Sequence, residues 1–274
     1  MIANIPTTNF KAHELTDNEL RFHAPSIFAQ APMRGLSQRY TFVPTTDIIA
    51  GLRDKHWLPV QVEEQRVRSE ARVGFQKHLL RFRRAEQMET LDEWNAELVL
   101  TNSHDAACAY LVQVGIYRRL CSNGLVVSDD SFEGVRFRHA GLKAEVVVQA
   151  SFQILELIPK ITTVIEAFRN RTMTEAEAIA FAARALMLRF DSFEHAPVEP
   201  RTLLTPRRAE DQTNDLWTIF NRVQENLLRG GLSDHQRTRS GRLRALRKLR
   251  GIDSRITLNK ELWKLAQAMV GHRN

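Results

Sequence analysis

The stretch Thr101–Val127, TNSHDAACAYLVQVGIYRRLCSNGLVV, decides the fold that the sequence predicts. Polar residues from Asn102 to Asp105 predict a turn, and beyond them Val114 and Ile116 recur with a period of two. That period places apolar side chains on one face of a strand. The Asn123-Gly124 pair predicts a second turn, because glycine adopts positive φ freely and asparagine tolerates it. The stretch therefore predicts antiparallel strands that are joined by short turns.

The same period of two continues on both sides of this stretch. Leu80 and Phe82 alternate with arginines, and so do Val135 and Phe137. Together these patterns predict a meander of four or five antiparallel strands with one buried face. The other predicted strands lie at Trp57–Gln65, Glu97–Leu100 and Ala109–Val112.

Beyond Gly141 the apolar residues recur at helical spacing. A long helix is predicted over Glu145–Asn170, and Pro159 is expected to kink it or to split it in two. Sheet first and helices afterwards is the order of an α+β fold, and it disfavours a parallel nucleotide-binding sheet. The other predicted helices are Asp47–Arg53 capped by Thr46, one capped by Thr174 and Glu177 that reaches Phe190, one from Leu216 to Leu227 that Gly230 stops, and one through Leu262 and Met269.

Changes in composition divide the chain into three predicted parts. Residues 1–40 are expected to form a loosely held arm, with ordered structure starting near Tyr40. Residues 41–190 form the predicted α+β core domain. Residues 191–274 form a linker, marked by three prolines up to Pro206, and a C-terminal basic helical region.

Length and composition exclude several classes of protein. The chain has 274 residues, of which 43% are apolar, and this suffices for a core of ordinary size. The sequence has no secretory signal and no apolar run of about 20 residues, so we expect no membrane partner. Two cysteines, Cys108 and Cys121, in a chain without an export signal predict a reducing compartment, and we expect the cytoplasm.

Positive charge is concentrated in one short segment near the C-terminus. Seven basic residues and no acidic residue fall between Gln236 and Arg250, and this equals the formal net charge of the whole chain, +7. A helix through Leu243, Leu246 and Leu249 would carry cations on its solvated side, where they can displace counterions from a phosphate backbone. The alternative is a solvated basic face, or one that docks on an acidic partner. The seven residues are Arg237, Arg239, Arg242, Arg244, Arg247, Lys248 and Arg250.

The arginines of the predicted sheet form a second candidate surface. Arg81 and Arg83 share one face of their strand, and the same period places Arg136 and Arg138 together. If the two strands are neighbours, the four guanidinium groups form one basic surface. The alternative is ordinary solvent-facing side chains that are paired with glutamates. Further candidates at the edge of this surface are Arg118 and Arg119, with the Tyr117 ring as a platform on which a base can stack.

Catalytic and metal-binding patterns are weak. Cys121 with His104 and Asp105 would supply a thiol, a base and an orienting carboxylate, but a free cysteine is more often a small buried apolar residue. His104, Cys108 and Cys121 lack the closely spaced ligand pairs of a zinc site. The sequence also contains no GxxxxGK loop, no GxGxxG pattern after a strand and no GxSxG elbow. We therefore assign no catalytic residue, no metal and no cofactor.

Two pieces of the sequence carry a resemblance to a known family. The segment from Asn102 to Val127 and the segment EDQTNDLWTIFNRVQENLLRGG, Glu210–Gly231, resemble the phage- and plasmid-borne family catalogued as domain of unknown function 932. The resemblance extends from about Tyr40 to Met269 and depends on N-S-H-D, C-S-N-G-L and N-x-L-W-x-x-F-N. In architecture, a strand meander followed by a long helix is also similar to single-strand annealing proteins of the Rad52 type. That similarity implies rings or filaments that hold single strands along a basic groove.

The leading functional hypothesis is a nucleic-acid-binding protein of a phage or plasmid. We expect ATP-independent annealing or protection of single-stranded DNA, by a homo-oligomer whose helices align many basic sites. A second hypothesis is a protein-interaction module that acts on a host factor. The third is a thiol-dependent enzyme that uses Cys121. Under the first two hypotheses the protein is not an enzyme.

Overall fold

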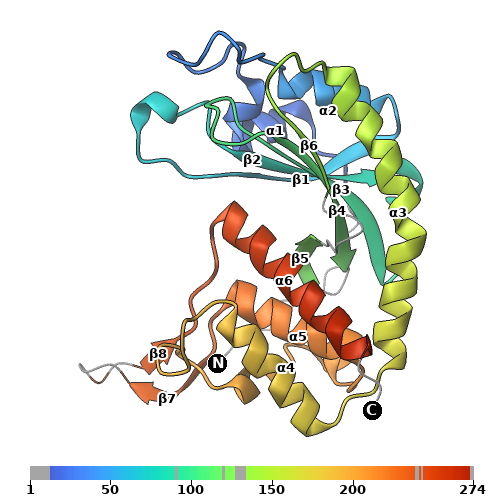
Figure 1. The fold of residues 1–274 in the computed structure, drawn as a ribbon, viewed down its shortest axis with the longest axis vertical. Helices are drawn as coiled ribbons and strands as arrows, with labels where there is room; N and C mark the ends of the chain where they lie inside the picture. Colours follow the sequence, from blue (N-terminus) through green and yellow to red (C-terminus); the bar gives the residue numbers. More distant parts are fainter. Residues whose placement is uncertain are drawn as a thin grey trace. The chain divides into compact units, whose positions relative to one another are not determined.

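The computed structural model describes residues 13–89, 92–118, 121–126, 134–237, 241 and 243–271, without the side chains of residues 121–124 and 235–237. Contacts within the chain divide it into two compact units. Unit 1 comprises Met1–Gly124 and Gly134–Gln153, and unit 2 comprises Leu125–Glu133 and Ile154–Asn274. The long helix α3, Ala144–Asn170, begins in unit 1 and ends in unit 2 (Figure 1).

Unit 1 is built on an antiparallel sheet. Its strands follow the order β1-β2-β3-β4-β5, and the short β6 pairs with β4. The meander and the α+β class are therefore confirmed. The strands are β1 Trp57–Glu64, β2 His78–Arg84, β3 Trp94–Asn102, β4 Tyr110–Arg118, β5 Cys121–Val126 and β6 Val135–Phe137.

The predicted period of two places one row of apolar residues across the sheet. Leu80 of β2 pairs with Leu100 of β3, which pairs with Val112 of β4, and all three are buried. The helices α1, Asp17–His23, and α2, Thr45–Arg53, lie on the same side of the sheet (Figure 1). Each buried side chain of this size contributes about 1.5–3 kcal/mol relative to its exposed state, so the row stabilises the meander.

Ordered structure starts earlier than the sequence predicts. Helix α1 has a capping box in which Thr16 and Glu19 bond each other's backbone amides. Leu20 of α1 and Ile27 of the following 3-10 helix, Pro25–Phe28, are fully buried. The prediction of a loose arm up to residue 40 is therefore wrong from residue 13 onward. The physical reason is that apolar residues of this segment are spaced to pack on unit 1.

Helix α2 also begins differently from the prediction. Pro44 is its N-cap, and the cap residue makes no side-chain hydrogen bond. The first turn therefore lacks the predicted Thr46 cap. Thr45 instead directs its hydroxyl into a buried polar cluster that is described below.

The helices of unit 2 follow the predicted pattern with two corrections. Pro159 lies inside α3, which continues as one helix, so the predicted split does not occur. Helix α4, Glu175–Met187, has the predicted capping box of Thr174 and Glu177 but ends before Phe190. The remaining helices are α5 Leu216–Arg229 and α6 Ile252–Gly271, and the short 3-10 helices are Glu70–Arg72, Ala85–Gln87, Pro200–Leu204 and Ala209–Asp211.

The proline-rich segment after Asp191 is packed against the rest of unit 2. Ala196, Val198 and Leu203 in this segment are buried, with exposed fractions of 0–1%. The predicted linker therefore contributes to the core of unit 2. Prolines here shape a compact turn-rich segment, which their fixed φ favours as much as an extended linker.

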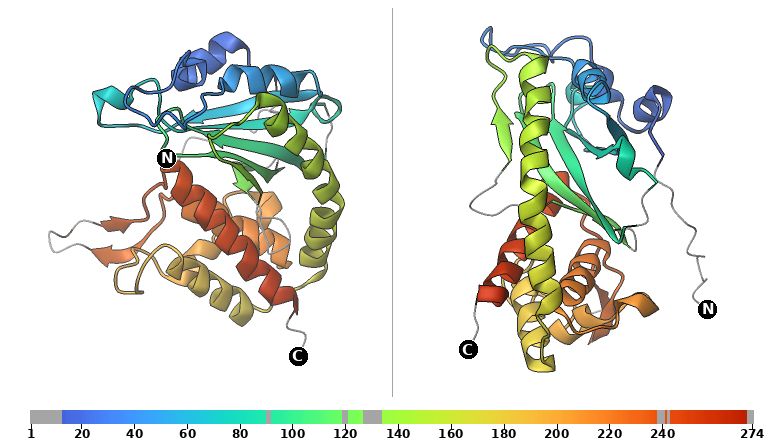
Figure 2. Two further views of the ribbon diagram at one scale, coloured as in Figure 1. Left: turned by 45° about the horizontal axis from the view of Figure 1, so that its top comes forward. Right: turned by 90° about the vertical axis from the view of Figure 1, so that its right-hand side faces the viewer.

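The basic segment forms a β-hairpin and not the predicted helix. Strand β7, Ser233–Arg237, pairs with β8, Leu243–Ala245, and the hairpin extends away from the helices of unit 2 (Figure 2). Leu246 is buried while Leu243 is 49% exposed, so the leucines do not share one apolar helix side. Backbone bonds that Leu246 exchanges with Gly231 and Leu232 continue the ladder and exclude a helix at this position.

A glycine at the base of the hairpin gives the first testable prediction. Gly230 has φ +62° and ψ −149°, a conformation that is nearly restricted to glycine, and an added Cβ would meet Leu246 O and lie 2.6 Å from Arg247 C. We expect Gly230→Ala to lower the free energy of unfolding by about 3 kcal/mol in urea titrations. Gly231→Ala is the matched control, because φ is +84° there but the added Cβ meets nothing within 4 Å. Its expected cost is about 1 kcal/mol, and equal costs at the two positions would contradict the prediction.

Candidate nucleic-acid interface and two buried polar clusters

The predicted sheet arginines on β2 are buried and ion-paired. Arg81 and Arg83 share one carboxylate, that of Glu97 on β3. Arg81 Nη1 lies 3.0 Å from Glu97 Oε2, and Arg83 Nη2 lies 2.8 Å from Glu97 Oε1. The exposed fractions of the three residues are 1–4%. These guanidinium groups link β2 to β3 on this face of the sheet. Because they are buried and paired, they are poorly accessible to a ligand.

The Tyr117 ring is also engaged within the sheet. The guanidinium carbon of Arg83 lies 4.3 Å from the centroid of this ring. A guanidinium at that distance makes a cation–π contact and covers one face of the ring. Tyr117 is therefore part of the packing around Arg83.

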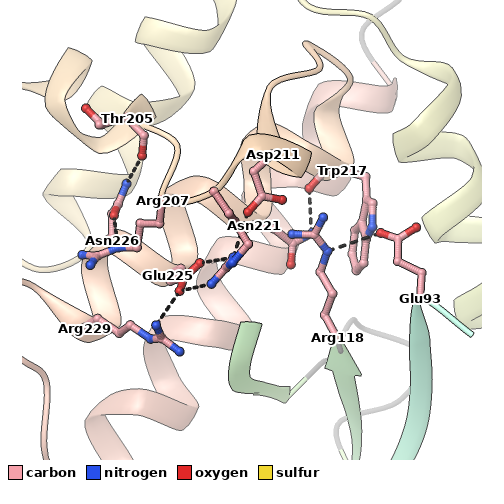
Figure 3. Close-up of polar contacts among 11 residues, drawn as sticks. Glu93, Arg118, Thr205, Arg207, Asp211, Trp217, Asn221, Glu225, Asn226 and Arg229 are labelled. Carbon is pink, nitrogen blue, oxygen red and sulfur yellow. Dashed lines mark hydrogen bonds and ion pairs between the residues drawn. The ribbon is translucent and has the colours of Figure 1, made fainter. Parts of the chain in front are cut away.

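The two arginine pairs do not form one surface. Strands β3 and β4 separate β2 from β6, so the condition of neighbouring strands is not met. Arg136 and Arg138 are exposed, as their alternation with Val135 and Phe137 predicts. Arg118 is buried, and its Nε lies 3.3 Å from Glu93 Oε1 (Figure 3). Arg119 lies outside the described residues.

The basic segment presents three cations to solvent. Arg247, Lys248 and Arg250 are exposed, and none of them pairs with a carboxylate in the described part of the chain. Arg244 is half-buried and donates to the carbonyl oxygens of Glu194, at 3.2 Å, and His195, at 2.8 Å. Arg244 thus fastens β8 to the segment after α4. The Arg237 side chain and the whole of Arg239 and Arg242 lie outside the description.

A buried polar cluster in unit 1 surrounds the hydroxyl of Thr45. His78 Nε2 lies 3.0 Å from Thr45 Oγ1, and His104 Nε2 and the Tyr110 hydroxyl each lie 3.1 Å from it. All four residues have an exposed fraction of 0%. Four elements therefore meet at one hydroxyl: α2, the start of β2, the turn after β3 and the start of β4.

The rest of this cluster connects it to the surrounding backbone. Ser26 Oγ lies 2.9 Å from His78 Nδ1, and Asn102 Nδ2 donates to Thr45 Oγ1 over 3.3 Å. Asn102 Oδ1 lies 3.0 Å from His139 Nε2, and the His139 ring stacks on Tyr40 with 4.5 Å between centroids. Buried polar groups that are hydrogen-bonded in this way specify a unique packing.

Burial sets the protonation of these histidines. Desolvation lowers the pKa of His78 to about 3 and that of His104 to about 4, and nearby histidines contribute further. Burial also lowers the pKa of His139. The three rings are neutral at physiological pH, and each then has one donor and one acceptor nitrogen.

Two residues of the thiol hypothesis, His104 and Asp105, make other contacts in the structure. Asp105, which would orient His104, accepts from Arg72 Nε at 2.8 Å and from the Ala107 amide at 3.0 Å. His104 uses its Nε2 for Thr45. The Cys108 thiol donates to Ala109 O over 3.0 Å, and the Cys121 side chain lies outside the description. Among the described residues, no group of three His, Cys, Asp or Glu side chains is arranged to hold a metal ion.

A second buried polar cluster in unit 2 surrounds Glu225 of α5. Its Oε1 accepts from Arg208 Nη2 at 2.6 Å and from Arg229 Nη1 at 2.9 Å (Figure 3). Arg208 Nη1 also lies 2.8 Å from Asp211 Oδ2. The Glu225 side chain is only 2% exposed, so these contacts form in a medium of low dielectric.

Side-chain hydrogen bonds of Asn226 also join α5 to the segment that precedes it. Asn226 Nδ2 donates to Leu203 O over 2.8 Å and to Thr205 O over 2.9 Å, and Arg207 Nε donates to its Oδ1 over 2.6 Å (Figure 3). At the N-terminus of α5, Asp215 accepts from the Thr218 amide as the N-cap. The cluster therefore joins α5 to the segment from Leu203 to Asp215.

Comparison with known proteins identifies the family. The profile of the family described as "Domain of unknown function (DUF932)" matches residues 32–263. The chain belongs to this family. It is similar to two Escherichia coli K12 proteins, UPF0380 protein YafZ and UPF0380 protein YfjQ, each 35% identical over 256 residues. These alignments cover 93% of this chain and 92% of each relative. No solved structure matches the chain, so the similarity to Rad52-type annealing proteins gains no support.

Two of the three sequence pieces that carry the DUF932 resemblance lie at the cluster around Thr45 and at the start of α5, and the third, C-S-N-G-L, lies in β5. Asn102–Asp105 supplies the N-S-H-D piece beside Thr45, and Asn214–Asn221 supplies the N-x-L-W-x-x-F-N piece at the start of α5. Sequence reasoning missed Thr45 and His78 as members of the first cluster. His78 shares the parity of Leu80 and Phe82, which was the available signal that it faces the core. None of the helices in the described part of the chain combines the length and apolar character that crossing a bilayer requires.

Proposed function

We propose that the protein binds nucleic acid through the basic segment of unit 2. The observation that carries this proposal is the exposure of Arg247, Lys248 and Arg250 without ion pairs among the described residues. Cations in this state keep their full charge for a ligand, whereas a paired cation must first be released from its carboxylate. The segment also contains no acidic residue between Gln236 and Arg250.

The mechanism of binding is phosphate neutralisation. Each cation that contacts a phosphate releases condensed counterions, so the binding free energy is largely independent of base sequence and falls as salt rises. Arg136 and Arg138 of unit 1 are two further exposed cations. Arg81, Arg83 and Arg118 are not included, because Glu97 and Glu93 neutralise them.

The proposed ligand is single-stranded DNA, which the protein anneals or protects without ATP as part of a mobile element. The absence of a GxxxxGK loop in the sequence supports a process that needs no nucleotide hydrolysis. A homo-oligomer would multiply weak contacts into stable binding by raising their effective concentration. A complex that survives nuclease treatment of a host lysate would favour the protein-interaction hypothesis instead.

The test is a salt titration of binding. We expect a fluorescent oligothymidine of 30 nucleotides to bind, with a slope of log K against log salt of about −0.7 per phosphate contact. The variant R247Q/K248Q/R250Q removes three cations, so its slope is expected to be shallower by about 2. Fluorescence anisotropy at four salt concentrations measures both quantities. Binding that is absent, or that does not respond to salt, would remove the proposal.

A further inference from the structure

Four loops of unit 1 meet at one end of its sheet. They are the segment 29–44 before α2, the β1–β2 loop 65–77, the β3–β4 turn 103–109 and the segment 138–143 after β6. Each strand that borders them ends or begins at that edge: Glu64 and His78 are paired, as are His78 and Asn102, and Tyr110 pairs with Phe137. The loops are therefore neighbours in space although up to about 100 residues separate them in sequence.

Backbone hydrogen bonds join the four loops to one another. The Met33 amide donates to His104 O over 2.9 Å, and the His104 amide donates to Phe75 O over 2.8 Å. The Thr41 amide donates to His139 O over 2.8 Å. Figure 2, right, shows the blue segment 29–44 and the yellow-green segment after β6 side by side. The loops thus form one continuous surface above the histidine cluster.

This surface is strongly positive. The four loops contain eight Lys or Arg and two Asp or Glu, which gives a net charge of +6. One acidic residue, Asp105, is neutralised by Arg72, whose Nη2 lies 2.6 Å from its Oδ2. Six cations of the loops are exposed, and no ion pair engages them in the described part of the chain: Arg34, Arg39, Arg66, Arg68, Arg138 and Lys143. We call these six residues the loop-end surface.

The composition of the loop-end surface indicates the chemistry of its ligand. Five of its six cations are arginines, whose planar guanidinium groups donate two parallel hydrogen bonds to a phosphate. The centre of a protein–protein contact is typically rich in aromatic and other apolar side chains. Among the described residues of these loops, Val73 is the one large apolar residue that is exposed, with an exposed fraction of 59%. A dense set of cations with a single exposed large apolar residue among the described loops fits a sugar–phosphate backbone.

We propose that the loop-end surface is a second nucleic-acid-binding site, carried by unit 1 and separate from the basic segment of unit 2. This inference deepens the proposed function and rests on it. Beneath the loops, hydrogen bonds to the Thr45 hydroxyl join the start of β2, the end of β3 and the start of β4. A chain with two such sites binds nucleic acid multivalently, which strengthens the overall binding.

The test compares three variants with the labelled 30-nucleotide oligothymidine. R34Q/R39Q/R66Q/R68Q removes four cations of the loop-end surface, and R247Q/K248Q/R250Q removes three of the basic segment. K55Q/K160Q/R184Q is the control, because these three cations are exposed, make no ion pair among described residues and belong to neither surface. We expect the loop-end variant to lose at least about tenfold in affinity and to have a slope that is shallower by about 3. The control is expected to stay within about threefold of the original protein.

The outcomes separate this inference from the proposed function. A loop-end variant that binds like the control, while the basic-segment variant weakens, overturns the second site and leaves the proposed function standing. Absence of binding by the original protein overturns both. Loss of affinity in the loop-end variant alone supports the site on unit 1 and overturns the basic segment as a binding site. A poly-glutamate peptide that binds the original protein as tightly as the oligonucleotide, and loses affinity in the same variant, overturns the nucleic-acid assignment.

A charge-preserving variant tests the guanidinium geometry. R34K/R39K/R66K/R68K keeps all four charges and removes the paired donors of arginine. We expect the salt slope to remain and the affinity to fall by roughly threefold to tenfold. A slope as shallow as that of the glutamine variant would overturn the inference, because charge would then not be the property that matters. Urea titration of each variant confirms that unit 1 remains folded.

Discussion

Glu97→Gln is expected to lower the free energy of unfolding by about 3–5 kcal/mol. Glu97 is the shared partner of Arg81 and Arg83, and the three side chains are almost completely buried. Removing the carboxylate leaves two guanidinium groups in a medium of low dielectric without a counter-charge. Urea titration followed by circular dichroism measures the change, which appears as a shift of the midpoint at an unchanged m-value.

An exposed ion pair provides the matched control for this prediction. Glu175 and Arg201 lie 2.7 Å apart, but their side chains are 70% and 68% exposed. We expect Glu175→Gln to change the free energy of unfolding by less than about 1 kcal/mol. The triple variant R81M/R83M/E97L is expected to be more stable than Glu97→Gln, because it leaves no buried charge. If Glu97→Gln cost no more than Glu175→Gln, the account of a buried charged trio would be wrong.

Acid is expected to destabilise unit 1 well above the pH at which carboxylates titrate. His78 and His104 have folded-state pKa values lowered to about 3 and about 4, whereas the unfolded value is about 6.5. Between these values the unfolded chain binds more protons than the folded chain, so stability is present above pH 6.5 and falls as pH falls. From pH 7 to pH 5 we expect a loss of about 2 kcal/mol for each of the two histidines, measured by urea titration at each pH.

The slope of stability against pH identifies the histidines that are responsible. His78→Asn is expected to make the slope shallower by about 1.2 kcal/mol per pH unit between pH 6 and pH 5, whatever it does to stability at pH 7. His195→Gln is the control, because His195 is exposed and its side chain lies outside the cluster. Hydrogen bonds from Thr16 lower the pKa of Glu19 to about 2, so this carboxylate titrates below the range from pH 5 to pH 7 in which the slope is measured. An unchanged slope in His78→Asn would show that the buried ring is not the titrating group.

Much of the sheet could be predicted because its signal is local. Leu80 and Phe82 alternate with arginines, and the structure places the two kinds of residue on opposite faces of β2. The same pattern did not reveal that Arg81 and Arg83 are buried. Whether the second face of a strand is solvated depends on Glu97, which comes from another strand. Period alone does not tell a surface arginine from one that is paired inside the protein.

The helix that the sequence predicts in the basic segment is wrong, because leucines at spacing three fit more than one conformation. Leu243, Leu246 and Leu249 match a helix, but Leu246 pairs through its backbone with Gly231 and Leu232, outside any local window. Non-local pairing overrode helix propensity here, as it often does in short segments. The prediction that this segment is basic and largely exposed does not depend on that error.

The loop-end surface cannot be predicted from the sequence for a different reason. Its charges are divided among four loops, and each loop carries a net charge of +3 or less. A sequence scan therefore finds one dense cluster, at Gln236–Arg250, and misses a second of nearly equal charge. Only the pairing of β1 with β2, β2 with β3 and β4 with β6 brings these loops to one edge.

The carboxylate that serves two guanidinium groups in the sheet has a consequence for how relatives of this chain diverge. A single substitution at position 81, 83 or 97 lowers the stability of the protein, because it leaves a buried charge unpaired. Replacing all three residues by apolar ones removes the buried charges and restores stability. Such positions are expected to be inherited together or lost together. Alignment of this chain with YafZ and YfjQ would show whether the three residues are kept together or replaced together.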